Sequence, residues 1–311
     1  MTKAQPKDLG ASVRARLLRF ARERGEDFQF ILMRYANERL LFRITESRHS
    51  HRFVLKGANL FTIWTGKPHR ATRDLDLLVS GNSGEAHMRE IFAEILALNT
   101  VDDGVRFDLA SLAVGPIRDG QEYGGIRVEV VAQVTTARVS LQIDLGFGDA
   151  ITPEATMKEL PALLDFPAPC LRTYPRETVV AEKIEAIVQL GMANSRMKDF
   201  YDLVIIARIF DFDGEVLVRA IRATFDRRQT PIPVELPVAL TAIFAADETK
   251  KIQWSGFVRK AGVHNAGTLQ EAIREIVIFL AEPLRAAASS ARPPRSLWPA
   301  GGPWKAGGEQ V

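Results

Sequence analysis

Two stretches of the chain alternate apolar and polar residues, a pattern typical of β-strands with one buried face. In residues 74–79, apolar side chains alternate with Asp74 and Asp76, and in residues 139–147 they alternate with polar side chains that include Asp144. Because residues two apart share one face of a strand, Asp74 and Asp76 are expected to point together, away from the core. The pattern therefore predicts two half-buried strands with carboxylates on their polar faces.

Other periodicities place further elements along the chain. The apolar run at residues 53–55 is typical of a buried strand, which Lys56 and Gly57 interrupt. Apolar spacings of three and four residues predict helices, and shorter alternating or apolar runs predict strands. The predicted helices cover residues 8–24, 28–44, 58–64, 85–98, 177–190, 197–210, 215–227 and 269–280, and two more predicted strands cover 106–114 and 125–134.

Composition along the chain suggests four parts. Residues 1–47 are expected to form an N-terminal helical cap and residues 48–150 a catalytic core. Residues 151–285 are expected to form a mainly helical domain, which begins with a proline-rich connection at 151–169. Residues 286–311 are rich in Pro, Gly, Ala and Arg and are expected to be a disordered tail, in which Trp298 and Trp304 stand out.

The overall composition is that of an ordinary globular protein. The chain has 311 residues, of which 46% are hydrophobic and 25% charged. No apolar run reaches the roughly 20 residues that a membrane-spanning helix needs, and the first residues lack the apolar stretch of a secretory signal. Cys170 is the single cysteine, so an intrachain disulfide is excluded. These features predict a cytoplasmic protein without membrane association.

Positive charge is concentrated at the N-terminal end. The net charge is only +3, but residues 1–56 contain 13 Lys or Arg against 6 Asp or Glu. A basic region beside an acidic site could attract a polyanion such as RNA. A pair of solvated, arginine-rich helices would have the same composition, and the sequence does not choose between these interpretations.

The carboxylates suggest a metal site. Asp74 and Asp76 side by side repel each other, and a cation between them removes the conflict. Mg²⁺ prefers carboxylate oxygens together with phosphate oxygens. Asp144 would join them if its strand lies next to residues 74–79. The alternative is that the Asp-Leu-Asp triplet is a solvated strand end, because such triplets are common.

Several motifs, taken together and in order, resemble the AbiEii/AbiGii family of nucleotidyltransferase toxins, which includes the MenT-like toxins. The resemblance begins with YANERLLFRI at residues 35–44 and continues with FVLKGANLF and TRDLDLL at 53–78. It resumes with ETVVAEKIEAIVQLGMANSRMKDFYDL at 177–203 and ends with Trp254, Phe257 and the segment at 276–284. It covers most of residues 30–285.

The resemblance implies an α+β fold similar to DNA polymerase β: a mixed sheet flanked by helices, followed by a helical C-terminal domain. It implies that Asp74, Asp76 and Asp144 hold Mg²⁺ and that Lys183 and Asp199 are catalytic. The chain differs from the family pattern at two places. Lys56-Gly57-Ala58 replaces the usual Gly-Ser or Gly-Gly pair, and Lys198 precedes Asp199 where the family tends to have arginine.

The substrate-binding residues expected from this reading are Lys56, Gly57, Arg73 and Lys183. Gly57 would let phosphates approach the backbone N–H groups, and Lys183 would place a positive charge on a phosphate. Lys183 could equally be a lysine extending from a helix edge, and Arg73 a surface residue. Asp199 would orient Lys183 by a charge-assisted hydrogen bond, or it would be a helix-surface acid that pairs with Lys198 or Arg196.

The implied activity is nucleotide transfer from an NTP to an RNA acceptor, most simply a tRNA 3′ end. As a toxin of a type IV-like toxin–antitoxin or phage-defence system, the protein would stop growth by blocking aminoacylation, and a cognate antitoxin would be its partner. Two alternatives stay open: a nucleotidyltransferase that modifies a small molecule or a protein, and a nucleotide- or RNA-binding module without turnover.

Overall fold

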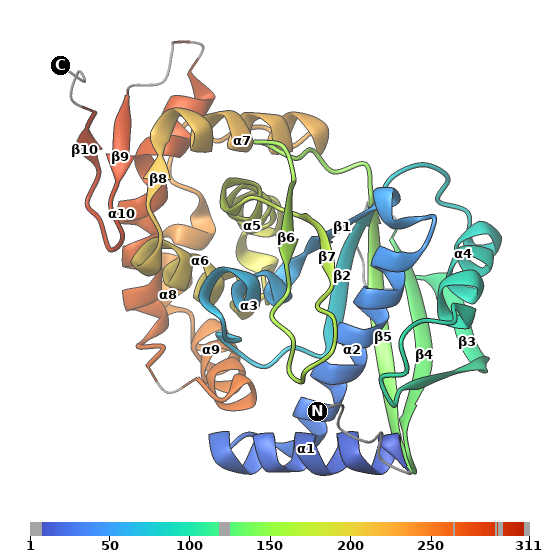
Figure 1. Ribbon diagram of the computed structural model, residues 1–311. Coiled ribbons are helices and arrows are strands. Elements are labelled where there is room, and N and C mark those ends of the chain that lie inside the picture. The colour runs from blue at the N-terminus through green and yellow to red at the C-terminus, as the bar shows by residue number, and fades with distance from the viewer. Residues whose placement is uncertain (1–7, 118–124, 264, 290, 292–294, 308–311) are drawn as a thin grey trace. The chain divides into compact units, whose positions relative to one another are not determined.

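The computed structural model describes residues 8–117, 125–263, 265–289, 291 and 295–307 (Figure 1). They divide into two compact units. Unit 1 lies within residues 1–148 and 156–173, and unit 2 within residues 149–155 and 174–311. The chain therefore enters unit 2, returns to unit 1 for residues 156–173, and then completes unit 2. No helix of the described ranges is long and apolar enough to cross a membrane.

Unit 1 is built on a mixed, seven-stranded sheet with the strand order β3-β4-β5-β2-β1-β7-β6. The pairs β2–β5 and β1–β7 are parallel, and the other neighbours are antiparallel. The strands are β1 (Phe53–Lys56), β2 (Asp74–Val79), β3 (Arg106–Pro116), β4 (Ile126–Val134), β5 (Ala137–Phe147), β6 (Thr156–Glu159) and β7 (Cys170–Thr173).

One face of this sheet is apolar and is covered by helices of the same unit. Leu75 and Leu77 of β2 and Leu145 of β5 are fully buried there, as the alternation predicts. Phe53 shares this face and packs edge-on against Phe92, with ring centroids 6.0 Å apart. The helices of unit 1 are α1 (Leu9–Arg24), α2 (Phe28–Glu46), α3 (Leu60–Thr65) and α4 (Glu85–Ala97), with 3₁₀ turns at Ser50–Arg52 and Gly57–Asn59.

Unit 2 is mainly helical. Its helices are α5 (Arg176–Leu190), α6 (Met197–Ile209), α7 (Gly214–Arg227), α8 (Ala242–Ala246), α9 (Glu248–Ala261) and α10 (Leu269–Ala288), with 3₁₀ turns at Gly191–Ala193 and Val238–Leu240. A small antiparallel sheet joins β8 (Phe212–Asp213), β9 (Ser296–Trp298) and β10 (Lys305–Ala306). The structure thus confirms the α+β class, with a mixed sheet flanked by helices and a helical second half.

Two expectations about domain organisation are wrong. Residues 151–169 were expected to be a domain connection, but β6 and the loop at 160–169 belong to the sheet unit. The tail at 286–311 was expected to be disordered, but its described part contains the end of α10 and two strands. Trp298 is buried and packs with Trp304 at a centroid distance of 5.5 Å, and both rings contact Phe279.

Both tryptophans donate to helix carbonyls that lack a helical partner. Pro283 lies inside α10 and has no N–H, so the carbonyl of Phe279 has no helical donor. The indole Nε1 of Trp304 donates to that oxygen at 2.8 Å. Trp298 Nε1 donates at 2.8 Å to Ala207 O in the last turn of α6. The C-terminal strands are therefore held by capping hydrogen bonds as well as by aromatic packing.

Trp304→Phe is expected to destabilise the protein by about 1–3 kcal/mol, because it leaves a partly buried carbonyl without a donor. Pro283→Ala restores an N–H to the helix, so Trp304→Phe should cost less in that background. A double-mutant cycle of urea unfolding measures the difference. Equal costs in the two backgrounds would show that the hydrogen bond from Trp304 to Phe279 contributes nothing.

Candidate functional site

The polar face of the sheet brings carboxylates from two strands together. β2 and β5 are parallel neighbours, with Asp76 in register with Asp144 and Asp74 in register with Gln142. Residues in register on paired strands point to the same face, so the three carboxylates share it. All three are half-buried. The predicted adjacency of the two strands is confirmed, whereas metal binding by these residues stays a prediction.

Arg127 is a site residue that the sequence reasoning missed. It lies opposite Asp144 in the β4–β5 hairpin and forms a two-pronged ion pair with it, Nε to Oδ1 at 2.8 Å and Nη2 to Oδ2 at 3.0 Å. The signal was available: β4 and β5 flank a two-residue turn between Val134 and Ala137, and counting back along both strands from that turn places Arg127 across from Asp144.

This pair bears on how the acids could hold a metal ion. Three carboxylates on one face are the kind of oxygen donors that Mg²⁺ prefers, so Asp74 and Asp76 fit the ion that the sequence implies. Among the described residues, however, no group of three His, Cys, Asp or Glu side chains is placed to hold a metal ion. Asp144 directs both oxygens at Arg127. The residues therefore fit a site centred on Asp74 and Asp76, and we expect that Asp144 would join it only through its remaining lone pairs.

Arg127→Gln is expected to tighten Mn²⁺ binding by roughly tenfold, because Asp144 loses its bidentate partner and a negative charge beside Asp76 becomes uncompensated. Mn²⁺ titration followed by electron paramagnetic resonance measures this without any turnover. Arg138→Gln is the matched control, since Arg138 of β5 is 3.6 Å from Asp108 and more exposed. Equal Mn²⁺ affinity in the Arg127 and Arg138 variants would contradict the expectation.

Lys56 and Gly57 border the carboxylates. Lys56 is in register with Asp76 across β1 and β2, so its side chain shares the polar face. Gly57 has a φ of +75°, and a Cβ at this position would lie 2.7 Å from the Asp76 Cγ. The glycine is therefore required locally, because any side chain would displace Asp76. Arg73, the other expected substrate-binding residue of this unit, is exposed and precedes Asp74.

Lys183 and Asp199 meet inside unit 2. Lys183 Nζ lies 2.8 Å from Asp199 Oδ1 and 2.7 Å from Asp202 Oδ2, and Arg196 Nε lies 2.7 Å from Asp199 Oδ2. Both carboxylates are buried, whereas the Lys183 side chain keeps 14% of its surface exposed. The expected contact between Lys183 and Asp199 is present. Asp202 holds the lysine equally closely.

The charges around Asp199 keep it ionised. Burial alone raises the pKa of this carboxyl, but Lys183, Arg196 and Lys198 outweigh burial and lower the pKa below its ordinary value. A carboxylate that stays charged at neutral pH holds the Lys183 ammonium in a fixed position. That Lys183 acts together with the carboxylates of the sheet unit stays a prediction.

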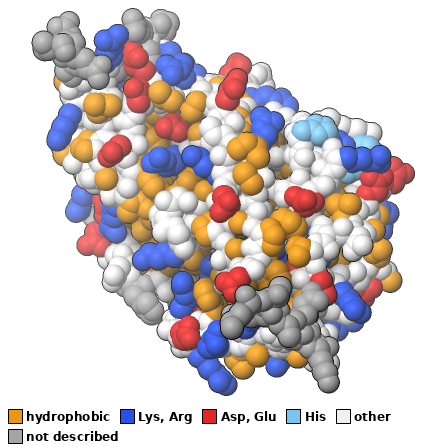
Figure 2. All heavy atoms as spheres, in the orientation of Figure 1, with side chains coloured by type: hydrophobic (Ala, Val, Ile, Leu, Met, Phe, Trp, Pro, Cys, Tyr) orange, Lys and Arg blue, Asp and Glu red, His pale blue; other side chains and the backbone are white. Residues whose placement is uncertain are grey.

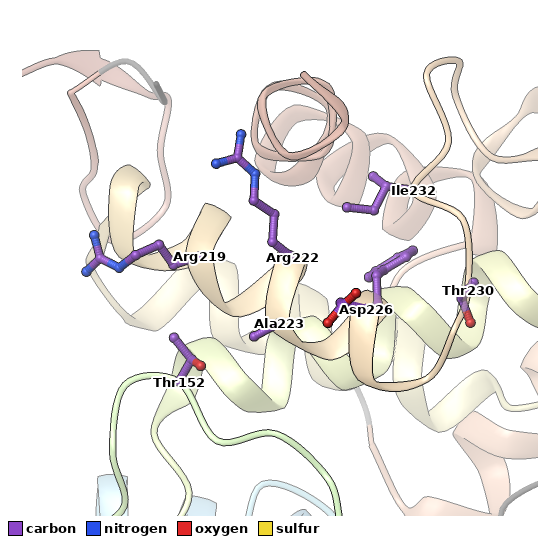
Figure 3. A pocket seen from close by; sticks show the side chains of 8 residues that line it. Thr152, Arg219, Arg222, Ala223, Asp226, Thr230 and Ile232 are labelled. Atoms are coloured by element: carbon purple, nitrogen blue, oxygen red, sulfur yellow. The ribbon is translucent and has the colours of Figure 1, made fainter. Parts of the chain in front are cut away.

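A hollow of about 750 Å³ opens along α7 (Figure 3). Its lining residues are Thr152, Arg219, Arg222, Ala223, Phe225, Asp226, Thr230 and Ile232. The guanidinium of Arg222 is already engaged in hydrogen bonds. It donates to the carbonyls of Ala286, Ala287, Ser289 and Ala291, in the last turn of α10 and just after it. None of the predicted site residues lines this hollow.

Two crystal structures from Helicobacter pylori are similar to this chain. One is of the protein JHP933, with 14% sequence identity, a TM-score of 0.44, and coverage of 80% of this chain and 89% of that chain. The other is of a candidate nucleotidyltransferase, with 14% identity, a TM-score of 0.43, and coverage of 80% and 92%. No curated protein matches this chain.

The family comparison is more extensive. The model of the nucleotidyl transferase AbiEii toxin family, of the type IV toxin–antitoxin system, matches residues 39–276. The matched region includes both strands with the paired carboxylates and the two helices that carry Lys183, Asp199 and Asp202. The chain therefore belongs to the AbiEii nucleotidyltransferase toxin family.

Proposed function

We propose that this nucleotidyltransferase uses Mg²⁺ to transfer a nucleotide from an NTP to an RNA acceptor, such as the 3′ end of tRNA. The observation that carries the proposal is the register of β2 and β5, which sets Asp76 beside Asp144 with Asp74 on the same face. Carboxylates clustered on a half-exposed polar face are suited to holding cations against phosphate oxygens.

Each residue of the sheet unit has a role in this proposal. Asp74 and Asp76 would hold Mg²⁺, and Asp144 would share in the site through the lone pairs that Arg127 leaves. Bound ions would stabilise the charge on the triphosphate and on the attacking oxygen. Lys56, on the same face as Asp76, would neutralise phosphate charge.

In the transfer, the acceptor hydroxyl oxygen bonds to the α-phosphorus of the NTP, and the bond from that phosphorus to the pyrophosphate breaks. The hydroxyl proton passes to a base, for which Asp144 is our candidate. Arg73 and Lys183 would balance the charge of the leaving pyrophosphate. Asp199 and Asp202 would act through Lys183, whose ammonium they hold at 2.8 and 2.7 Å.

The biological role that we propose is that of a toxin. The family is described as a type IV toxin–antitoxin family, which supports a cognate antitoxin as partner. Addition of nucleotides to tRNA would block aminoacylation and arrest growth, and an RNA acceptor of this kind would place the reaction in the cytoplasm.

Incubation of the pure protein with each labelled NTP, Mg²⁺ and total RNA tests the proposal. Label on tRNA that requires Mg²⁺ is the expected result. Label on protein or on a small molecule would replace the RNA acceptor by another acceptor class. No label with any NTP, in the presence of RNA, protein and small-molecule acceptors, would leave a binding module without turnover.

A further inference from the structure

Helix α1 presents an arginine-rich face to solvent. It contains Arg14, Arg16, Arg19, Arg22 and Arg24 against one acid, Glu23. Its apolar stripe is buried in unit 1, and Arg16 is tied to Asp165 at 2.8 Å. The other four arginines are exposed. In Figure 2, Lys and Arg side chains appear along the lower edge, where α1 lies in Figure 1.

The charge of these four arginines is hardly neutralised by the protein. Arg14 lies over the Phe28 ring at 5.5 Å and Arg24 over the Phe20 ring at 4.3 Å. Such stacking fixes a guanidinium but leaves its N–H groups at the edge for other acceptors. Arg19 has one distant contact, 3.8 Å to the exposed Glu23. Arg22 makes no ion pair or hydrogen bond to a side chain of the described residues.

The helix lies at a fixed distance from the carboxylates. Its first turn packs on the β4–β5 turn, where a Cβ on Gly10 would be 2.8 Å from Thr135 Cγ2. Asp144 is seven residues along β5 from its start at Ala137, a span of about 24 Å at roughly 3.4 Å per residue. One nucleotide cannot contact both places, whereas an RNA helix is long enough to do so.

We propose that this face of α1 binds the phosphate backbone of the RNA acceptor. The inference rests on the proposed function, since it names the part of the protein that would hold that acceptor. Helix α1 precedes the region that matches the family model, residues 39–276. A membrane surface is a poorer partner, because the apolar stripe that would enter lipid is buried.

The test compares two full-length variants that each lose three positive charges. Arg14→Gln/Arg19→Gln/Arg22→Gln removes charge from α1. Lys251→Gln/Arg259→Gln/Lys260→Gln removes it from exposed positions of α9 and is the control. Affinity for total tRNA is measured by filter binding at several salt concentrations, without NTP or Mg²⁺, and circular dichroism checks folding.

If three phosphate contacts are lost, the slope of log affinity against log salt should decrease by about 2 to 3 in the α1 variant. The control should keep the wild-type slope. A third variant, with lysine at the same three positions of α1, should retain most of the slope, because phosphate contact needs the charge more than the fork geometry. Equal slopes in the α1 variant and the control would overturn the inference.

Failure of this inference and failure of the proposed function are distinguishable. If tRNA is labelled but the salt slope does not depend on α1, the transferase proposal holds and the RNA-binding face is wrong. If the slope depends on α1 but no RNA is ever labelled, the face binds RNA and the proposed RNA acceptor is wrong. If neither the wild type nor the variants bind tRNA, the RNA-binding face is rejected.

Discussion

Asp76→Asn is expected to abolish nucleotidyl transfer while the protein stays folded. Asparagine keeps the shape that packs against Gly57 but removes the charge that would hold the metal ion. A loss of about a thousandfold or more is expected, equivalent to roughly 4 kcal/mol of transition-state stabilisation. Incorporation of labelled NTP measures the activity, and Mn²⁺ titration reports on the metal site independently of turnover.

The matched control for Asp76 is Glu159→Gln in β6, where all four residues are exposed. It removes one negative charge from the edge strand of the same sheet, three strands away from β2, and should retain wild-type activity. Thermal unfolding should be similar for the two variants. Full activity in Asp76→Asn, with the charge removed, would exclude Asp76 from the mechanism.

Arg39→Met is expected to have the largest effect on stability. Arg39 is fully buried, and its Nη2 donates to Glu38 Oε1 at 2.7 Å and to Pro167 O at 2.8 Å. The other Glu38 oxygen accepts from Leu163 N at 2.8 Å, so the pair ties the loop at 160–169 to α2. Removing one partner of a buried ion pair costs about 3–5 kcal/mol, because the other charge is left uncompensated.

A second substitution and a change of pH test whether the uncompensated charge of Glu38 causes this loss of stability. Burial outweighs the nearby arginine and raises the pKa of Glu38 above its ordinary value. In Arg39→Met the pKa should rise further, so the destabilisation should be greatest at neutral pH and shrink as falling pH protonates the buried carboxyl. Glu38→Gln/Arg39→Met removes the charge and should recover much of the loss. Urea unfolding at pH 5 and pH 7.5 tests both, and a pH-independent cost would contradict this explanation.

The strands of the central sheet were predictable because alternation encodes a half-buried strand. Every second residue of 139–145 is buried as expected. Strand β6 was not predicted, because all four of its residues are exposed and give no alternation. Helix α9 was not predicted for a related reason. Within its 14 residues only Lys250 and Trp254 are buried, so it has no apolar stripe.

The candidate site was predictable in its residue types and less so in its pairings. That Asp74 and Asp76 point to the same face follows from the two-residue repeat of a strand alone. Adjacency of β2 and β5 is a long-range fact that local pattern cannot supply, because parallel pairing carries no turn signal. Arg127 was missed because the polar residues of β4 were not matched with the residues opposite them in β5. The contact of Asp202 with Lys183 was not predicted, because the two residues come together only once α5 and α6 are packed against each other.

The hydrogen bonds from Trp298 and Trp304 have a consequence for the order in which unit 2 can fold. The last turn of α6, a helix that carries Asp199, receives a donor from a residue 91 positions further along the chain. The carbonyl that Pro283 leaves without a helical donor in α10 receives one from Trp304. Both helices therefore gain these donors only when the segment that carries the two tryptophans has docked on them.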